Sequence, residues 1–497
     1  TNKMMTIGKK LVIIFSIGLV LIILGLTTGI CWSMIYSSIL NAELSLTPTS
    51  TSYKLWKETP IPMYLKIYMF NLTNYEDFIS SSESKVKPNF VEMGPYVFRE
   101  IDYKVGQIWN DNDTITYQRK RVWHFDKSLS VGSLDDNVTN INPITASVAY
   151  ALRQKKPILR DLVGRIMKAM GQKLIITKSV NELLFEGYED IMLKIARKMN
   201  FSGIPYNKFA WFYERNGSAS YDGTFNMLTG KSNLLDVGIV KKWNFNNRVS
   251  YYPKTCGEVK GTNGDLWPPL PNNKTITFFV PDICTSLSVT YENTIVHEGL
   301  TGVKYISDNT ILDNGTKVDS RLCYSDGERI PSGVLNISLC KWGAPAFISL
   351  PHFYLADPSY RENIDGMEPS KIKHELSISI EPKTGVPLNV HAQLQLNLLV
   401  QHDSAMSMFK NIKTTFVPML WFTQEAYLTA DYARIIKFIN ILETLGSITS
   451  YGIACIGVLI MSIGIFLYIK HGFNGEENQV LLSNKSNEND GIATINE

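Results

Sequence analysis

Two short motifs contain residue types that bind zinc or phosphate in enzymes, but each lacks a residue that its chemistry requires. His297 and Glu298 would begin a zinc-binding helical motif if a second histidine followed at position 301, where the chain has Thr301. Residues 230–232 (Gly-Lys-Ser) are similar to the end of a phosphate-binding loop, yet position 225, where such a loop needs glycine, is Phe225. Its side chain would keep the backbone away from a phosphate.

A third motif, residues 313–316 (Asp-Asn-Gly-Thr), is similar to one phosphate loop of the two-span ectonucleotidases, which need two such loops. The motif overlaps a glycosylation sequon, and a hairpin turn explains it better. The sequence contains no complete catalytic or metal-binding constellation. We therefore predict that the protein is not an enzyme, binds no metal and needs no cofactor.

Basic residues gather in one part of a chain whose formal net charge is only +3. Eight of them stand against the single acid Asp161, namely Arg153, Lys155, Lys156, Arg160, Arg165, Lys168, Lys173 and Lys178. Such a field attracts fatty-acid carboxylates, anionic phospholipids or oxidised lipoprotein. The alternative is an ordinary solvated helix surface, which carries Lys and Arg without binding anything. The near-neutral chain as a whole gives no indication of nucleic-acid binding.

The basic residues lie in a segment with helical periodicity, which runs from Pro143 to about residue 200. Pro143 and Pro157 stand at first-turn positions, and residues 179–182 (Ser-Val-Asn-Glu) match a capping box for a third helix. On the second helix one half of the wheel is apolar, with Leu159, Leu162, Val163, Ile166, Met167, Ala169 and Met170. The other half carries Arg160, Asp161, Arg165 and Lys168.

Strands are expected on both sides of this helical segment. Short alternating segments separated by Asn, Asp and Gly run from Pro60 to about residue 125, and the same texture returns from about residue 210 to residue 401. No internal repeat, low-complexity tract or long linker divides the region. We therefore predict an α+β fold in which one large antiparallel β domain carries a compact helical bundle at residues 143–200.

Two apolar runs, residues 11–30 and 448–469, contain no charged residue. Each provides about the 20 residues that a helix needs to cross a bilayer core of roughly 30 Å. The first run is longer than the apolar region of a signal peptide, and Cys31 and Trp32 follow it instead of a small-residue cleavage site. We therefore predict that it is an uncleaved anchor, so that the chain has a membrane helix near each end.

The charges that flank the first run set the expected orientation. Lys3, Lys9 and Lys10 precede it, and Glu43 is the first charge after it, so the positive-inside rule places both chain ends in the cytosol. The expected organisation is a cytosolic tail (1–10), a membrane helix (11–35), an extracytoplasmic domain (36–444), a second membrane helix (445–469) and a cytosolic tail (470–497).

Sequons and cysteines agree with this topology. Eight N-glycosylation sequons lie in the proposed outer domain, at Asn71, Asn112, Asn137, Asn200, Asn216, Asn273, Asn314 and Asn336. A ninth, at Asn484, lies in the tail, which the glycosylation machinery does not reach. Four cysteines also lie in the outer domain, namely Cys256, Cys284, Cys323 and Cys340. An even number in an oxidising compartment predicts two disulfides, for which three pairings are possible.

Several stretches along the chain match one family in its own order. They are residues 60–62 (PIP), 66–74 (KIYMFNLTN), 92–100 (EMGPYVFRE), 281–284 (PDIC), 350–353 (LPHF), 364–367 (IDGM) with Pro369, 380–385 (IEPKTG), 394–397 (LQLN) and 417–421 (VPMLW). Together with the two apolar runs they resemble the class B scavenger receptors over nearly the whole chain. The resemblance implies an antiparallel β-barrel ectodomain, with the helical bundle at its membrane-distal apex and a mostly apolar tunnel toward the bilayer.

The resemblance also implies disulfides Cys256–Cys323 and Cys284–Cys340. A third, short bridge found in some relatives should be missing, because no cysteine lies between 323 and 340. Relatives use an apical lysine to meet a fatty-acid carboxylate, and the position matched without gaps is Ala169. We therefore expect Lys168 or Lys173 to supply this charge. The candidate ligand-binding residues of the apex are Lys155, Lys156, Arg160, Arg165, Lys168 and Lys173.

The C-terminal tail contains a candidate sorting motif. Glu477 stands four residues before the pair Leu481 and Leu482, which is similar to the acidic dileucine signal that clathrin adaptors bind. An exposed apolar pair in a polar tail is a natural peptide anchor for an adaptor. The motif therefore predicts cycling between the plasma membrane and endosomes or lysosomes.

We therefore expect a lipid-handling receptor of the plasma membrane. It would bind lipoprotein, anionic lipid particles, fatty acids, sterols or carotenoids at the apex and pass lipid down a tunnel to the membrane. Keeping each CH₂ group out of water during this transfer is worth roughly 0.8 kcal/mol. Three alternatives remain, namely a lysosomal receptor or lipid exporter of the same fold, a two-span ligand-gated channel, and an ectoenzyme.

Overall fold

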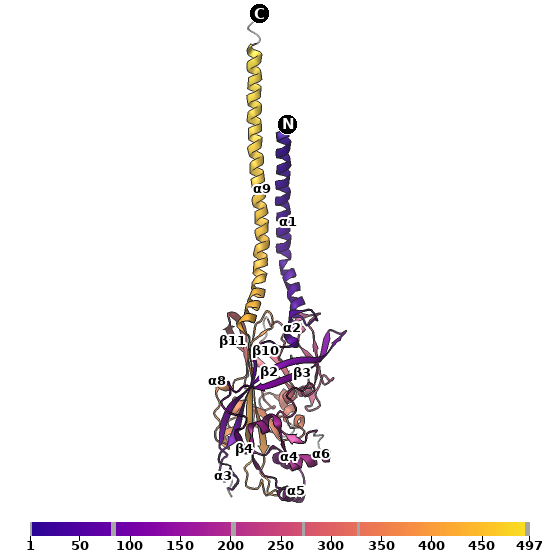
Figure 1. Cartoon of the computed structure of the whole chain (residues 1–497), viewed down its shortest axis with the longest axis vertical. Coiled ribbons are helices and arrows are strands. Elements are labelled where there is room, and N and C mark those ends of the chain that lie inside the picture. The colour runs from indigo at the N-terminus through magenta and orange to yellow at the C-terminus, as the bar shows by residue number, and fades with distance from the viewer. Residues whose placement is uncertain (1, 81–85, 200–204, 271–273, 326–328, 493–497) are drawn as a thin grey trace. The chain divides into compact units, whose positions relative to one another are not determined.

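The computed structural model describes residues 2–80, 86–199, 205–270, 274–325 and 329–492, with side chains between residues 9 and 470. The chain divides into two compact units (Figure 1). The first unit comprises residues 1–40 and 434–497, and the second comprises residues 41–433. Each unit is built around its own internal contacts.

The α-helices of the described residues are α1 (Asn2–Leu44), α2 (Thr51–Lys57), α3 (Tyr75–Ser80), α4 (Pro143–Leu152), α5 (Pro157–Ala169), α6 (Ile191–Lys198), α7 (Ser359–Glu362), α8 (Lys371–His374) and α9 (Ala430–Ile492). The strands are β1 (Met63–Leu72), β2 (Phe90–Asn110), β3 (Thr114–Phe125), β4 (Asn137–Ile141), β5 (Ile175–Ser179), β6 (Tyr188–Glu189), β7 (Lys208–Phe209), β8 (Thr224–Leu228), β9 (Val240–Trp243), β10 (Thr275–Val280), β11 (Thr285–His297), β12 (Leu300–Ile306), β13 (Leu335–Asn336), β14 (Ala346–Ser349), β15 (Ser377–Ile380), β16 (Pro387–Val400) and β17 (Thr415–Tyr427).

The first unit is a pair of long apolar helices, whose candidate membrane-spanning parts are Lys9–Leu44 and Ala430–Lys470. The indole Nε1 of Trp32 donates a hydrogen bond of 2.9 Å to the backbone carbonyl of Glu443. A Cβ atom on Gly25 would lie 2.4 Å from the backbone nitrogen of Ala454. Small residues therefore let the two helices approach closely, as is common where helices pack within a bilayer.

The second unit is built on a 13-stranded antiparallel sheet whose main strand order is β10-β11-β12-β15-β16-β17-β1-β2-β3-β8-β9. The short strands β13 and β14 join this sheet beside β16. The longest pairings involve β2 with β3 and β16 with β17. The alternating sequence pattern therefore predicted the strands correctly, and the α+β fold class is confirmed.

The segment at Gly261 and Thr262 lies between the two edge strands and nearly closes the sheet into a barrel. The backbone N–H of Val240 in β9 donates to the carbonyl of Gly261, and the N–H of Phe279 in β10 donates to the carbonyl of Thr262, both within 2.8 Å. A Cβ atom on Gly261 would lie 2.0 Å from the carbonyl oxygen of Thr277. Glycine is therefore required where the closing segment meets β10.

Two disulfides fasten loops beside this closing segment. Cys256 bonds Cys323 and Cys284 bonds Cys340. This is the pairing that the family resemblance implied. The two cysteines in the apolar helices, Cys31 and Cys455, are free.

The segment between β3 and β8 contains short helices framed by a two-stranded sheet of β4 and β5. Asn142 caps the first turn of α4, and Asp190 caps that of α6, each by accepting hydrogen bonds from two backbone N–H groups. The prolines predicted to begin helices do begin α4 and α5. These elements, α4 to α6 with the connections between them, are called the helical segment below.

The third helix predicted in this segment does not form as expected. Ser179 and Glu182 make both hydrogen bonds of a capping box, at 3.2 and 3.0 Å. However, the box opens a single π-helical turn, Glu182–Glu186, which ends at Gly187 with φ of 77°. The glycine reverses the backbone before an α-helix develops, and the actual third helix is α6.

Three clusters of buried apolar side chains make the core of the second unit. Cluster 1 includes Leu46, Trp56, Ile115, Tyr117 and Phe225, and it lies under α2 and the closing segment. Cluster 2 includes Tyr150, Met167, Phe347, Leu399 and Phe409, and it joins the helical segment to β14 and β16. Cluster 3 includes Leu65, Phe98, Trp123, Leu184 and Phe212, and it packs strands β1, β2 and β3 against the helical segment.

Candidate functional site

The helical segment borders a pocket with a cavity of about 290 Å³. Helix α4 contributes one face of the lining, with Ala146, Ala149 and Tyr150. The end of β16 and the loop that follows it contribute the other side, including Leu399, Val400, His402, Asp403, Phe409 and Thr414. Arg153, Gln154 and Arg160 complete the lining from the connection between α4 and α5 and from the start of α5. The pocket therefore combines an apolar wall from cluster 2 with several polar groups.

Two arginines give this pocket its charge. Arg160 Nη1 lies 2.9 Å from Asp403 Oδ2, and both side chains are largely buried. The guanidinium of Arg153 lies 3.7 Å from the ring centroid of Tyr150, and its Nη1 donates to the Tyr150 carbonyl at 3.0 Å. With Asp403 as the acid among its lining residues, the pocket has a formal charge of +1 when His402 is neutral. A site of this sign favours an anionic group.

Helix α5 exposes much of the apolar half of its wheel. Leu162 is 53% exposed and Ile166 is 45% exposed, whereas Met167 and Gly164 are buried. Ile158 and Leu159 are also exposed. The buried side of α5 faces the loop after β16, where a Cβ atom on Gly164 would lie 3.6 Å from Met406. We call Ile158, Leu159, Leu162, Ile166 and Met170 the apolar ridge of α5.

The candidate basic residues fall into two groups. Arg160 enters the pocket described above. The other five are exposed, namely Lys155, Lys156, Arg165, Lys168 and Lys173. Arg165 pairs with Asp161 on the helix surface at 2.7 Å. The structure therefore separates the six candidate residues into one pocket-lining guanidinium, that of Arg160, and five solvated charges.

Sequence reasoning missed two parts of this region. Asp403 and Tyr150 complete the pocket, but they lie about 250 residues apart in the chain, and no local pattern joins them. The backbone carbonyl of Lys173 accepts a hydrogen bond from Thr145 at 2.9 Å, so the start of α4 fixes the loop that follows α5. Only the tertiary fold brings these groups together.

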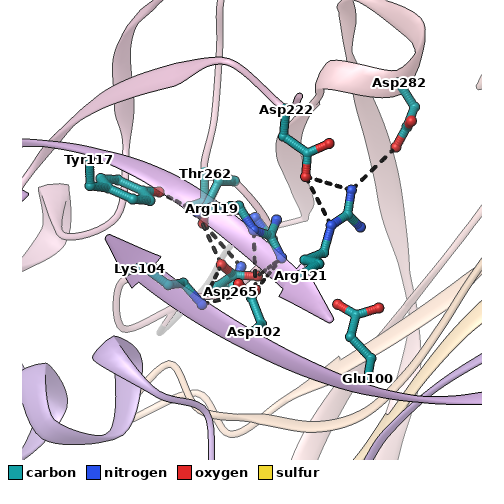
Figure 2. Close-up of polar contacts among 12 residues, drawn as sticks. Glu100, Asp102, Lys104, Tyr117, Arg119, Arg121, Asp222, Thr262, Asp265 and Asp282 are labelled. Atoms are coloured by element: carbon teal, nitrogen blue, oxygen red, sulfur yellow. Dashed lines mark hydrogen bonds and ion pairs between the residues drawn. The ribbon is translucent and has the colours of Figure 1, made fainter. Parts of the chain in front are cut away.

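The barrel interior contains a second polar cluster, the ionic layer, which Figure 2 shows. Its members are Glu100, Asp102, Lys104, Arg119, Arg121, Arg215, Asp222, Asp265 and Asp282. Asp102 lies 3.0 Å from Lys104 and 2.5 Å from Arg119. Asp222 lies 2.7 Å from Arg121 and 2.9 Å from Arg215. Charges alternate along β2 and β3 in the sequence, but this pattern also fits a solvated strand face.

The ionic layer holds most of its acids ionised. Burial alone would raise the pKa of Asp102, but Arg119 and Lys104 lower it to about 2. Arg215 and Arg121 likewise overcome burial and lower the pKa of Asp282. Glu100 behaves differently, because burial raises its pKa and Arg121 compensates only in part. Acids so strongly paired keep their charge at endosomal pH.

The ionic layer interrupts an otherwise apolar surface on the inner face of β2 and β3. On one side of it lie Phe98 and Trp123 of cluster 3, and on the other side lie Ile115 and Tyr117 of cluster 1. Between them the inward residues of the two strands are charged. Several buried charges on this face would interact unfavourably with an alkyl chain, which cannot hydrogen-bond to them.

The predicted glycosylation sites differ in accessibility. Asn112, Asn137 and Asn216 are exposed, and Asn71 is partly exposed. Asn200 and Asn273 lie outside the described residues. Asn336 is 7% exposed and Asn314 is 2% exposed. The Asn314 amide donates to the carbonyls of Ile330, Pro331 and Val334 at 3.0 to 3.3 Å. This packing leaves little room for a glycan at Asn314 or Asn336, and the glycosylation sites stay predictions.

Among the described residues, no group of three or more His, Cys, Asp and Glu side chains is arranged to hold a metal ion. The predicted sorting residues Glu477, Leu481 and Leu482 belong to the C-terminal part of α9, whose backbone is helical to Ile492. Their side chains lie outside the described part of the chain. The sorting motif therefore stays a prediction.

A model of the CD36 family matches residues 16–468 of this chain. Protein peste of Drosophila melanogaster is 34% identical over 435 residues, which are 86% of this chain and 77% of that protein. Scavenger receptor class B member 1 of Bos taurus is 28% identical over 462 residues, or 91% and 88% of the two chains. Lysosome membrane protein 2 of Mus musculus is 32% identical over 418 residues, or 83% and 84%. The resemblance found in the sequence motifs is thereby confirmed.

Proposed function

The chain belongs to the CD36 family and is a class B scavenger receptor-like membrane protein, and from this premise we propose that it binds lipid particles through the helical segment and delivers their lipid to the membrane. The particles in question are lipoproteins and anionic lipid particles. Fatty acids, sterols or carotenoids are the lipids that they would release. No covalent chemistry is part of this proposal. We further propose that both chain ends are cytosolic, that residues 36–444 are extracytoplasmic and that the helical segment is the membrane-distal apex.

The observation that carries the proposal is the apolar ridge of α5 together with the exposed cations of the helical segment. A helix that exposes Leu162 and Ile166 to water and carries Arg165 and Lys168 on its polar half has the character of an interfacial helix. Such helices bury their apolar face at the boundary of headgroups and acyl chains. The flanking lysines and arginines then meet anionic headgroups.

The interior of the second unit limits the route that delivered lipid would take. Clusters 2 and 3 adjoin the helical segment and offer apolar surroundings, including a small cavity of about 10 Å³ beside Met69, Ile141 and Met419. This cavity has room for about one water-sized sphere. The ionic layer makes the inner face of β2 and β3 unfavourable for alkyl chains. We therefore propose that lipid moves along clusters 2 and 3 and that side-chain motion widens this path.

The experiment compares particle binding by cells that express the full chain or its Leu162→Gln, Ile166→Gln variant. Glutamine keeps the helix propensity while removing the apolar surface. Losing lipid contact by two half-exposed side chains costs on the order of 1–2 kcal/mol, or roughly a tenfold loss of affinity. Binding of fluorescent anionic vesicles and of lipoprotein at low temperature should fall by this factor at equal surface expression.

The matched control is Ile372→Gln, because Ile372 on α8 is 96% exposed and lies far along the chain from the helical segment. This variant should bind particles like the wild type. Unchanged binding by the ridge variant would contradict the proposed docking surface. Equal losses in both variants would also contradict it, because they would indicate a general dependence on exposed apolar residues.

A second candidate function is that of a lysosomal membrane receptor or lipid exporter with the same fold. It is favoured by the similarity to lysosome membrane protein 2 and by the acidic dileucine motif, with clathrin adaptors as partners of the tail. Acids that stay ionised near pH 5 in the ionic layer suit such a compartment. Subcellular fractionation of the untagged chain separates the two functions, because a lysosomal receptor would have most of its molecules in the lysosomal fraction at steady state.

A further inference from the structure

We propose that the pocket between α4, the start of α5 and the loop after β16 binds the phosphate of a lipid headgroup. This inference rests on the proposed function, because it names the chemical group of the lipid that the helical segment would recognise. It concerns Arg153 and Arg160 inside the pocket and not the exposed cations beside the apolar ridge. The two surfaces can therefore be tested separately.

The first argument is the arrangement of the two guanidinium groups. Both arginines line one cavity, and each is held in place by a neighbour, Arg160 by Asp403 and Arg153 by the ring and carbonyl of Tyr150. Guanidinium groups with fixed orientation match the oxygens of phosphate in a fork geometry, and little side-chain entropy remains to be lost on binding.

The second argument is an unsatisfied donor on Arg160. Its Nε is buried and has no hydrogen-bond partner among the described residues. A buried polar group without a partner costs free energy, and a shift of the Arg160 side chain toward a ligand oxygen in the pocket would recover it. Asp403 occupies only part of the donor set of Arg160, through Nη1. The other carboxylate oxygen of Asp403, Oδ1, accepts a hydrogen bond of 2.9 Å from the backbone N–H of Ala405. The carboxylate is therefore held beside Arg160 but does not satisfy it.

The third argument is the size and lining of the cavity. Pockets that enclose a drug-sized ligand are roughly 300–1,000 Å³ in volume. The cavity here is about 290 Å³, which suits a headgroup but not a complete phospholipid or a long acyl chain. Gln154, Gln401 and Thr414 add neutral hydrogen-bonding groups around the arginines, while Leu399 and Phe409 form the apolar wall. Several polar groups around two cations fit a phosphate with its ester oxygens better than a single carboxylate.

The test measures binding of soluble probes to the full chain in a nonionic detergent by isothermal titration calorimetry. The probes are dihexanoyl phosphatidic acid, hexanoate and inorganic phosphate. We expect phosphatidic acid to bind and hexanoate to bind at least tenfold more weakly, since charge-assisted bonds to phosphate outnumber those to a carboxylate. Inorganic phosphate that competes with equal affinity would overturn the assignment to a lipid and leave a free-phosphate site. Equal affinity for hexanoate and phosphatidic acid would overturn the assignment to phosphate.

Two variants change the affinity in opposite directions. Arg153→Gln with Arg160→Gln should weaken phosphatidic acid binding by about tenfold or more, because it removes charge-assisted hydrogen bonds. Asp403→Asn should tighten it several-fold, because the carboxylate no longer competes for Arg160 while Asn keeps an acceptor for Ala405. A folding defect does not produce tighter binding, so the second variant guards against that explanation. Unchanged affinity in both variants would overturn the proposal.

The matched control is Arg248→Gln outside the helical segment, where the exposed guanidinium pairs with Glu258 at the surface. It should bind phosphatidic acid like the wild type. Failure of the proposed function is seen separately, because particle binding depends on the apolar ridge and headgroup binding depends on the pocket. One result would support the pocket and contradict the docking surface. In this result phosphatidic acid binding depends on Arg160, while particle binding is unchanged by the substitutions at Leu162 and Ile166.

Discussion

The imidazole rings of His352 and His374 stack with centroids 4.4 Å apart and an interplanar angle of 3°. Each ring uses Nδ1 to accept a backbone hydrogen bond at 3.0 Å, His352 from Glu368 and His374 from Ser370. Protonation of either Nδ1 would break its bond. Burial and the neighbouring His352 lower the pKa of His374 to about 4. The surroundings of His374 therefore favour its neutral form.

This pairing predicts a loss of stability on acidification. The pKa of His374 is about 6.5 in an unfolded chain and lower in the folded chain, so its stabilisation is complete above pH 6.5 and is lost as the pH falls toward 4. We expect this group to cost about 1 kcal/mol at pH 5 after allowance for solvent screening. Thermal unfolding of the full chain in detergent should show this loss, and His374→Asn should flatten the dependence. His124→Asn, at an exposed strand position, should leave the slope as in the wild type.

The ionic layer predicts a large effect from a small substitution. Asp102→Asn keeps the shape of the side chain but leaves the two cationic groups of Arg119 and Lys104 on the single remaining carboxylate of Asp265. Breaking a buried ion pair from one side costs about 3–5 kcal/mol. Urea unfolding should show a free energy of unfolding lower by this amount and a correspondingly lower midpoint, and Asp111→Asn on the exposed hairpin should change little. A midpoint within error of the wild type would mean that water enters the layer and solvates the arginine.

Local signals predicted much of the helical segment and of the membrane helices. Pro143 and Pro157 mark the starts of α4 and α5 because proline lacks an N–H at positions where none is needed. The capping box at Ser179 also forms, yet Gly187 ends the helix after one turn. The helical periodicity identified the apolar half of α5, but a helical wheel does not show which residues of the helix other elements bury. The loop at Met406 covers Gly164 and Met167 and leaves Leu162 in solvent.

The pocket and the ionic layer were not predictable from local sequence. Arg160 meets Asp403, and Arg215 meets Asp282, only because strands and loops far apart in the chain are brought together by the barrel. Alternating charges along β2 and β3 indicated an amphipathic strand, but they read equally well as a solvated face. Asn314 was likewise predicted as a glycosylation site from its sequon alone, and the sequon does not indicate that the side chain is buried.

Glycosylation should follow the burial of the sequons. We expect Asn137 and Asn112 to carry glycans and Asn314 to be unmodified, because its amide is 2% exposed and donates to three carbonyls. Mass spectrometry of glycopeptides after enzymatic deglycosylation in heavy water measures each occupancy. Asn314→Gln should also lower the unfolding free energy by about 1–3 kcal/mol, since buried partners lose their donor. Asn137→Gln is the surface control. A fully occupied Asn314 would contradict the packing described here.

The tail motif predicts a change in traffic. Replacing Leu481 and Leu482 with Ala should raise the surface fraction at constant total expression, because an adaptor that binds the apolar pair would no longer remove the chain from the plasma membrane. Surface biotinylation and antibody uptake measure the effect. Val480→Ala, which leaves the pair intact, is the matched control. Identical surface fractions for all three chains would show that Glu477, Leu481 and Leu482 match a sorting signal by chance.

The exposed cations beside the apolar ridge predict discrimination between lipid classes. Lys168 and Lys173 are both solvated and lie outside the pocket of Arg160. Each exposed charge pair contributes under about 1 kcal/mol, so Lys168→Ala with Lys173→Ala should weaken uptake of anionic lipid by several-fold and not abolish it. Neutral sterol ester should be spared, because its transfer depends on apolar contact. The measurement is the ratio of anionic to neutral lipid uptake by cells with equal surface expression. The control for total charge is Lys241→Ala with Lys242→Ala on β9. Equal loss of both lipids would indicate impaired docking, while no loss of either would show that these lysines only solvate the helix.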